Sequence, residues 1–179
     1  PSDPADGVLT ITAQPTPSQY ANDIPTPYVS GHINTANAFE YRYGYAEMRA
    51  KVPAGAGLLS TFYALRTDKA ALGELDALEY LGVSPKALYQ TTHFTAEDGT
   101  VTKDKTVRTA VSDLSLDFHT YGVDWTPTTI TYYLDGVAMG SLATPASISG
   151  PMYLIADLSV GGDFPGYPNS TTPFPARQK

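Results

Sequence analysis

The string GELDALEY, residues 73–80, constrains the fold more than any other part of the chain, because it carries three carboxylates within six positions. They belong to Glu74, Asp76 and Glu79. Glycines bracket the acids and the apolar residues do not recur at helical spacing, which argues against a helix. Apolar and acidic residues alternate instead, as in a β-strand with one acidic face and one apolar face. The string therefore predicts a strand, and with it a sheet.

The third acid of the string stands one position too late for strict alternation. Glu74, Asp76 and position 78 would share a face, but the acid is Glu79. One extra residue, a β-bulge, would return Glu79 to the side of the other two. Three like charges on one surface repel one another and raise one another's pKa, so their grouping indicates a chemical role. A solvated strand face is the alternative that spacing alone leaves open.

Composition narrows the class of protein and of partner. A chain of 179 residues is long enough for one domain with a substantial core. Its net charge of −7, without a block of basic residues, disfavours nucleic acid and anionic membrane surfaces as partners. The absence of cysteine excludes disulfides and a thiol nucleophile. Thirteen tyrosines provide flat rings with hydroxyl groups, which suit stacking on sugars and are also common in strands.

Turn residues divide the chain into short segments that predict about ten strands and no helix. The predicted strands cover residues 7–12, 28–35, 41–52, 58–65, 73–81, 86–94, a pair around 100–108, 118–125, 129–136, 137–142 and 151–162. Turns at this spacing are typical of a sandwich. Trp125 is expected in the core because it alternates with Tyr121 and Val123. We therefore predict a single β-sandwich domain over residues 1–179.

Five segments together resemble, in chain order, the family 16 glycoside hydrolases, the group of laminarinases, lichenases, agarases and carrageenases. They cover most of residues 28–176 and read YVSGHINT, YGYAEMRAKVPAGAGLLSTFYAL, GELDALEYLG, DFHTYGVDWTPTTITYYLDG and PMYLIADLSVGGDFPGYPNSTTPFPA. The acidic string with its extra residue resembles the bulged form of the motif in laminarinases and agarases. The lichenase form lacks the insertion.

The resemblance implies an all-β jelly-roll sandwich of two curved antiparallel sheets with a concave substrate cleft. It also implies an endo-acting retaining β-glycanase that hydrolyses a β-1,3/1,4-linked polysaccharide, a glucan or an exopolysaccharide. Glu74 matches the nucleophile and Glu79 the acid/base, with Asp76 between them. A non-catalytic carbohydrate-binding domain and a transglycosylase with the same carboxylates are the alternatives. Three intact carboxylates argue against a purely binding role.

The chemistry of retention sets requirements for the two glutamates. A retaining enzyme needs its carboxyl groups about 5–5.5 Å apart, one to attack the anomeric carbon and one to protonate the leaving oxygen. We expect a raised pKa for the acid Glu79 and a lowered pKa for the nucleophile Glu74. Asp76 is expected to hydrogen-bond Glu74 and to help keep Glu79 protonated.

Four further residues are predicted to bind substrate. Glu47 and Arg49 match family positions that face the cleft, although a surface ion pair with Lys51 is an equal alternative. His93 shares a polar face with Thr91, and the resemblance places it near the acid/base and the leaving-group sugar. Asp157 replaces the asparagine usual in the family, where an acid could bind a hydroxyl group or repel an anionic substrate.

The ends of the chain depart from the family pattern. The family's first strands should precede GVLTIT, residues 7–12, and its last strand should follow PFPARQK, residues 173–179, and neither is evident. No metal site and no cofactor are carried over, because the family's calcium ligands belong to those parts. Unpaired sheet edges would invite self-association. The polysaccharide is the expected partner, and a secreted or periplasmic location is the expectation from the resemblance.

Overall fold

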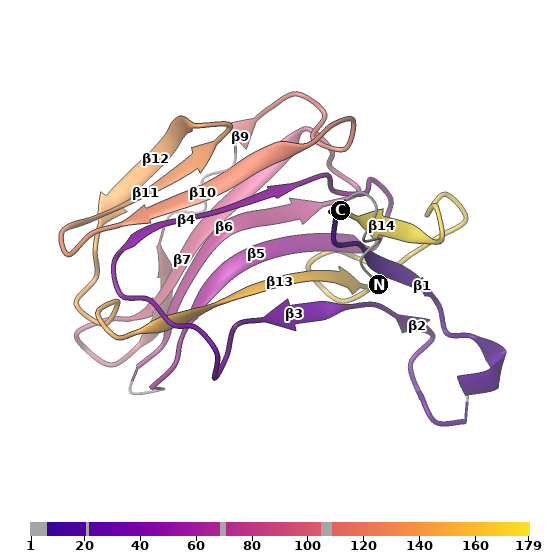
Figure 1. Ribbon diagram of the computed structural model, residues 1–179, viewed down its shortest axis with the longest axis horizontal. Coiled ribbons are helices and arrows are strands. Elements are labelled where there is room, and N and C mark those ends of the chain that lie inside the picture. The colour runs from indigo at the N-terminus through magenta and orange to yellow at the C-terminus, as the bar shows by residue number, and fades with distance from the viewer. Residues whose placement is uncertain (1–6, 21, 69–70, 105–108) are drawn as a thin grey trace.

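The protein is described by a computed structural model that covers residues 7–20, 22–68, 71–104 and 109–179. Within those ranges it contains fourteen β-strands and one 3-10 helix, η1 (Ser18–Tyr20). The strands pair antiparallel and form three sheets, of which the two larger ones lie one over the other (Figure 1). The expected all-β jelly-roll sandwich is confirmed.

The larger sheet has seven strands and carries the acidic string. Its order is β3-β13-β5-β6-β7-β8, with β9 paired to β7. The strand bounds are β3 (His32–Asn34), β5 (Leu58–Arg66), β6 (Gly73–Leu81), β7 (Ala87–Thr95), β8 (Val101–Asp104), β9 (Thr109–Ala110) and β13 (Met152–Val160). Strand β6 lies in the middle of this sheet and therefore has a neighbour on both sides.

The second sheet has four strands, in the order β12-β11-β10-β4. Their bounds are β4 (Gly44–Ala50), β10 (His119–Trp125), β11 (Thr129–Leu134) and β12 (Val137–Ala143). A third, small sheet has the order β14-β1-β2 and joins the two ends of the chain. It consists of β1 (Ile11–Pro15), β2 (Tyr28–Val29) and β14 (Ala176–Gln178). The third sheet was not predicted, because its strands are only two to five residues long.

The core fills the space between the two larger sheets. Every second residue of β5 and β10 points into it, as alternation requires. Trp125 is completely buried, with its ring 5.8 Å from that of Tyr41 and 4.7 Å from that of Tyr43. Its predicted core position is confirmed. Burial of this apolar face fixes which side of each strand remains available for function.

The extra residue of the acidic string is a β-bulge in β6. On β5, Tyr63 pairs with Asp76 and the preceding residue, Phe62, pairs with Leu78, which skips Ala77. Opposite β7, the register shifts between Asp76 and Glu79 in the same way. Ala77 and Leu78 are both buried in the core, so two residues instead of one separate Asp76 from Glu79. The predicted bulge is confirmed from both neighbouring strands.

The predicted strand pair around residues 100–108 is described only in part. Its first strand is β8, residues 105–108 lie outside the described part of the chain, and β8 and β9 each pair with β7. In the residues that the structure describes, no helix has the length and apolarity that a membrane crossing would require.

Candidate active site

The three carboxylates of β6 lie on the face of the seven-stranded sheet that is turned away from the core, called the open face below. Glu74 and Glu79 are half-buried, and Asp76 is only 3% exposed. The apolar residues between them point the other way, into the core. The bulge thus brings all three acids to one face of a central strand, as the sequence predicted.

Asp76 joins Glu74 to His93 on the neighbouring strand. In the register of β6 and β7, Glu74 lies opposite His93, and Nε2 of His93 is 3.3 Å from Oδ2 of Asp76. One ligand atom from each of these three side chains lies within 4.8 Å of the others. His93 therefore contacts the Glu74 end of the acidic string. In the strand register Tyr89 lies opposite Glu79, and the predicted place of His93 near the acid/base stays a prediction.

The pKa values of the paired carboxyls are raised. Burial, with the charge of Asp76 and a smaller effect of Glu79, raises the pKa of Glu74 to about 7, against an opposing effect of His93. Burial and the charge of Glu79 raise the pKa of Asp76 well above its usual range. The expected lowering of the Glu74 pKa is therefore wrong for the free protein, because desolvation outweighs the imidazole. Both shifts favour retention of a proton by this pair near neutral pH.

Glu79 lies in a different environment at the far side of the bulge. The hydroxyl group of Thr91 donates a hydrogen bond of 2.6 Å to Oε2 of Glu79. Thr91 itself is buried and is held through its carbonyl, which accepts a 2.6 Å hydrogen bond from the hydroxyl group of Tyr132. One carboxylate oxygen of Glu79 is thus fixed, which leaves the other to face a substrate.

Tyr63 is a functional candidate that the sequence did not reveal. It lies on β5 directly opposite Asp76 and is half-buried on the open face. Burial, with the charges of Asp157 and Glu74, raises the pKa of Tyr63 to about 12, so its hydroxyl group stays a hydrogen-bond donor. Its alternation with Thr61 could have indicated that Tyr63 lies on a polar face, but the strand over residues 58–65 is mostly apolar, which is typical of a strand buried on both faces.

Asp157 lies on the open face, two strands from the acids. The register runs from Asp157 on β13 through Thr61 on β5 to Glu79 on β6. The hydroxyl group of Thr61 donates a 2.8 Å hydrogen bond to Oδ1 of Asp157, and Nδ1 of His32 lies 3.6 Å from Oδ2. Asp157 is therefore a fixed acceptor in the same row as Glu79, where it can meet a sugar hydroxyl group.

Glu47 and Arg49 are not part of this group. They belong to β4 in the four-stranded sheet, and their neighbours Ala46 and Ala50 point into the core, so both charged side chains point away from it. Glu47 accepts a 2.6 Å hydrogen bond from Tyr45 on the same strand. The guanidinium of Arg49 lies 4.4 Å from the centre of the Phe118 ring. The structure thus places both residues on the other sheet, away from the carboxylates, and their role in substrate binding stays a prediction.

The alternative for Glu47 and Arg49, an ion pair with Lys51, is also not what the structure shows. The ammonium group of Lys51 donates a 2.8 Å hydrogen bond to the carbonyl of Leu116. Among the described residues, the ion pairs involve other side chains. Alternation identified correctly that these charges share a face, but the face belongs to the other sheet.

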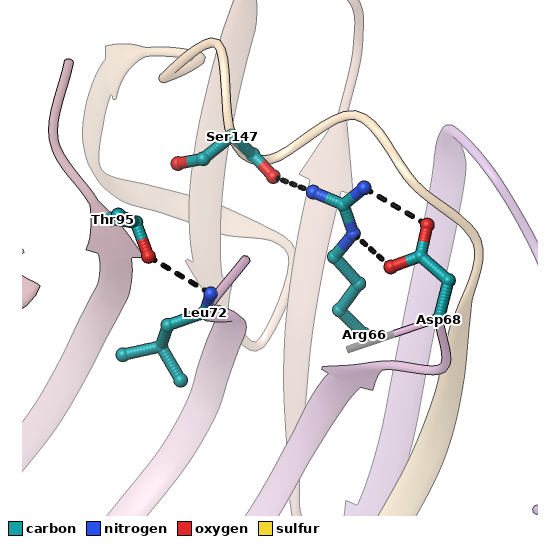
Figure 2. Close-up of polar contacts among 5 residues, drawn as sticks. All are labelled: Arg66, Asp68, Leu72, Thr95 and Ser147. Carbon is teal, nitrogen blue, oxygen red and sulfur yellow. Dashed lines mark hydrogen bonds and ion pairs between the residues drawn. The ribbon is translucent and has the colours of Figure 1, made fainter. Parts of the chain in front are cut away.

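Polar contacts hold the end of β5 and the residue just before β6. Figure 2 shows the guanidinium of Arg66 held by both carboxylate oxygens of Asp68 and by the carbonyl of Ser147. A bidentate arginine–carboxylate pair adds geometric specificity, so the end of β5 is fixed against the turn that carries Ser147. The backbone N–H of Leu72 donates a 2.9 Å hydrogen bond to the hydroxyl group of Thr95 on β7 (Figure 2).

Two carboxylates and an imidazole form a donor set that a divalent transition metal can accept, so Glu74, Asp76 and His93 are the residues that could hold one. The raised pKa values of both carboxyls favour a proton at the same place at neutral pH. An ion would therefore compete with the shared proton for this cluster.

Comparison with known proteins places this arrangement in a family. The profile of the glycosyl hydrolases family 16 matches residues 5–172. The endo-1,3-1,4-beta-glycanase ExsH of Rhizobium meliloti is 37% identical over 157 residues, which are 87% of this chain and 33% of that protein. The chain thus spans about a third of the length of ExsH and of EglC, a second endo-1,3-1,4-beta-glycanase of the same organism.

Solved structures share both the fold and part of the sequence. The endo-beta-1,3-glucanase of Pyrococcus furiosus superposes with a TM-score of 0.82 and 29% identity, over 97% of this chain and 72% of that one. The laminarinase catalytic domain of Thermotoga maritima gives a TM-score of 0.79 and 28% identity, over 97% and 74%. With the family profile matching almost the whole chain, this protein belongs to family 16 of the glycosyl hydrolases.

Proposed function

We propose that the chain is an endo-acting β-glycanase that hydrolyses a β-1,3/1,4-linked glucan or exopolysaccharide with retention of configuration. The observation that carries the proposal is the bulge in β6, which brings Glu74 and Glu79 to one face and gives each a separate environment. The names of the relatives, an endo-1,3-1,4-beta-glycanase and endo-1,3-glucanases, support this substrate class.

In the first step Glu74 attacks the anomeric carbon while Glu79 protonates the departing glycosidic oxygen. Glu74 must be ionised to attack, so the proton it shares with Asp76 must reside on Asp76. Asp76 is suited to this because its burial raises its pKa well above the usual range. The C–O bond to the leaving sugar breaks as the bond to Glu74 forms, and the product is a glycosyl ester of Glu74.

In the second step water hydrolyses that ester. Glu79, now ionised, removes a proton from the water as the water oxygen bonds to the anomeric carbon and the ester bond breaks. Thr91 holds Oε2 of Glu79 by a 2.6 Å hydrogen bond in the resting protein, which keeps the carboxylate oriented between the two steps. Two displacements on opposite faces of the sugar restore the original configuration.

The residues around the carboxylates bind and orient the sugars in this scheme. The hydroxyl group of Tyr63, beside Asp76, donates a hydrogen bond to the sugar. Asp157, which lies two strands from the acids, accepts a hydrogen bond from a sugar hydroxyl group. His93, in contact with Asp76, orients the shared proton of the Glu74 pair.

A panel of laminarin, lichenan, agarose and carrageenan tests the substrate class. We expect new reducing ends from laminarin or lichenan, accompanied by a fall in viscosity because internal linkages are cut. Proton NMR of the first products should show the β-anomer. Reducing ends from agarose or carrageenan alone would contradict the proposed substrate, and transfer to an added oligosaccharide in place of water would identify a transglycosylase. Binding of the polymers without any cleavage would identify a carbohydrate-binding domain.

The proposed substrate also bears on location. A polysaccharide is too large to be imported intact, so the enzyme acts outside the cytoplasm, in the secreted or periplasmic fraction. Detection of the native protein by antibody in cell fractions tests this, and its recovery only from the cytoplasm would contradict it.

The open edge of the four-stranded sheet is the basis for proposed self-association. Within the described residues β4 pairs only with β10, and grooves of about 340 and 260 Å³ lie along its other edge. An uncovered edge strand can pair with another chain. Sedimentation equilibrium should show a dimer that dissociates on dilution, whereas a monomer at all concentrations would contradict the proposal.

A further inference from the structure

Gln90 is a fully buried polar residue on the core face of β7, directly beneath the acids. Its side chain points away from the open face, since its neighbours Tyr89 and Thr91 lie on that face opposite Glu79 and Asp76. A buried amide that serves only for packing would be unfavourable unless it were hydrogen-bonded. Its partners therefore indicate what it does.

The amide nitrogen of Gln90 donates two hydrogen bonds, and both go to backbone carbonyls. One runs 3.0 Å to the carbonyl of Ala77, and the other 3.1 Å to the carbonyl of Tyr133. Two carbonyl acceptors require the NH₂ group at this position, which fixes the orientation of the amide.

The first acceptor belongs to the bulge itself. Ala77 is the residue of β6 that has no counterpart on β5, since Tyr63 pairs with Asp76 and Phe62 with Leu78. A bulge disrupts the ladder locally and leaves its extra residue unpaired. The side chain of Gln90 therefore provides a hydrogen bond at the point where the regular ladder is broken.

The second acceptor lies on the opposite sheet, also at an irregularity. Between Tyr132 and Tyr133 the register of β11 with β12 shifts. Gln90 thus links the broken ladder of the seven-stranded sheet to that of the four-stranded sheet through the core. Through Gln90 the bulge is held in place relative to the four-stranded sheet, which pairing with β5 and β7 alone does not achieve.

We propose that Gln90 is a positioning residue for the reaction, whose amide holds the Ala77 bulge and thereby sets the separation of Glu79 from the Glu74–Asp76 pair. The inference rests on the proposed function for its catalytic consequence, but its structural part does not. The titratable groups facing the bulge are Asp76 and Glu79 on β6, His93 on β7 and Tyr132 on β11.

Three variants test the role. Gln90→Met keeps the length of the side chain and removes both donors, while Gln90→Glu can donate one hydrogen bond when protonated and none when ionised. Thr92→Ser is the matched control. Thr92 is equally buried and lies on the same face of the same strand, and serine keeps the hydroxyl group that bonds Tyr132 at 2.8 Å.

Two readouts are needed, one of which does not depend on turnover. Steady-state kinetics are measured on the polysaccharide that the wild type cleaves best, at a temperature where circular dichroism shows each variant folded. Carbon-13 NMR of labelled Asp and Glu carboxyls follows the titration of the Glu74–Asp76 pair in the same proteins.

For Gln90→Met we expect kcat to fall at least tenfold with KM within twofold, and the carboxyl titration to move. Thr92→Ser should leave kcat within twofold and the titration unchanged. Gln90→Glu, whose buried neutral carboxyl can donate one hydrogen bond instead of two, should fall between Gln90→Met and the wild type in kcat at pH 5. A titration that moves in Gln90→Met while the wild type shows no turnover would support the role of Gln90 and overturn the proposed function alone.

The inference is overturned if folded Gln90→Met matches Thr92→Ser in both kcat and titration. If Gln90→Met does not fold, Gln90→Glu decides the question at pH 5, where its buried carboxyl is neutral and can donate one hydrogen bond instead of two. Wild-type kcat and wild-type carboxyl chemical shifts in that variant would overturn the inference, and displaced shifts with a lower kcat would support it.

Discussion

Strands β4 and β6 have the same kind of sequence and opposite surroundings. Both alternate apolar residues with charged ones, in AEMRA on β4 and ELDALE on β6. On β4 the charged side chains, Glu47 and Arg49, are exposed on the outside of the four-stranded sheet. On β6 the acids are half-buried or buried in the middle of the seven-stranded sheet.

The difference arises from the neighbours of each strand. Strand β4 pairs with β10 only, so its charges meet solvent and nearby rings. Strand β6 has β5 and β7 on its two sides, which bring Tyr63, Thr91 and His93 beside the acids. Burial then raises the pKa of Glu74 and Asp76. Position in the sheet, more than the charge pattern, makes a carboxylate chemically useful.

The largest expected contrast is in activity. Glu74→Gln and Glu79→Gln should each lower kcat about a thousandfold or more, because nucleophilic attack or proton transfer is lost. Glu47→Gln, the same substitution on β4, should leave kcat within twofold. Reducing-end assays on the folded variants measure this, and undiminished turnover in either β6 variant would refute the assignment.

Asp76→Asn tests the shared proton and should lower kcat roughly a hundredfold, since an oriented partner of the nucleophile is lost. In the proposed first step Asp76 is neutral and Asn is its neutral counterpart, so the acidic limb of the kcat/KM profile should stay in place. A limb that moves to lower pH would show that Asp76 is ionised when Glu74 attacks.

His93→Gln should have a smaller effect on kcat and should act on the acidic limb. His93 lowers the pKa of Glu74, so its replacement should move the acidic limb to higher pH, with a loss of kcat of about tenfold. The pH profiles of kcat and kcat/KM measure both effects. A limb that moves to lower pH would contradict the contact.

Stability offers a contrast that needs no substrate. The pKa of Glu74 is raised from 4.5 to about 7 on folding, so the stability contributed by the protonated form is complete below pH 4.5 and is lost as the pH rises through 7. Glu74→Gln should therefore be more stable than wild type at pH 8 by roughly 1–3 kcal/mol and equal at pH 4. Urea unfolding at both pH values tests this, and a destabilised variant at pH 8 would contradict the raised pKa.

The smallest effect is expected on β4. Arg49→Gln removes an exposed charge and its contact with the Phe118 ring, so it should change the free energy of unfolding by no more than about 1 kcal/mol and leave KM unchanged. A several-fold rise in KM would show that β4 contributes to substrate binding after all.

The sequence was sufficient for the fold and for the acidic strand, because alternation and one extra residue determine which side chains share a face. Alternation with Thr91 indicated that His93 lies on a polar face, and the structure places both residues on the open face. Alternation could not say which of two sheets a charged face belongs to, so the position of Glu47 and Arg49 on the other sheet had to come from the structure. It also gave no reason to single out Gln90, since a polar residue within a strand reveals its partner only when the opposite sheet is known.

Chemical rescue of the two glutamate variants by azide, with an activated aryl β-glycoside, tests the central claim most directly. In Glu74→Ala, azide takes the place of the nucleophile and attacks the anomeric carbon, so the account predicts an α-glycosyl azide. In Glu79→Ala the ester of Glu74 forms and azide then displaces it, which predicts a β-glycosyl azide. The reverse pairing, or the same anomer from both variants, would contradict the roles assigned to the two ends of the bulge.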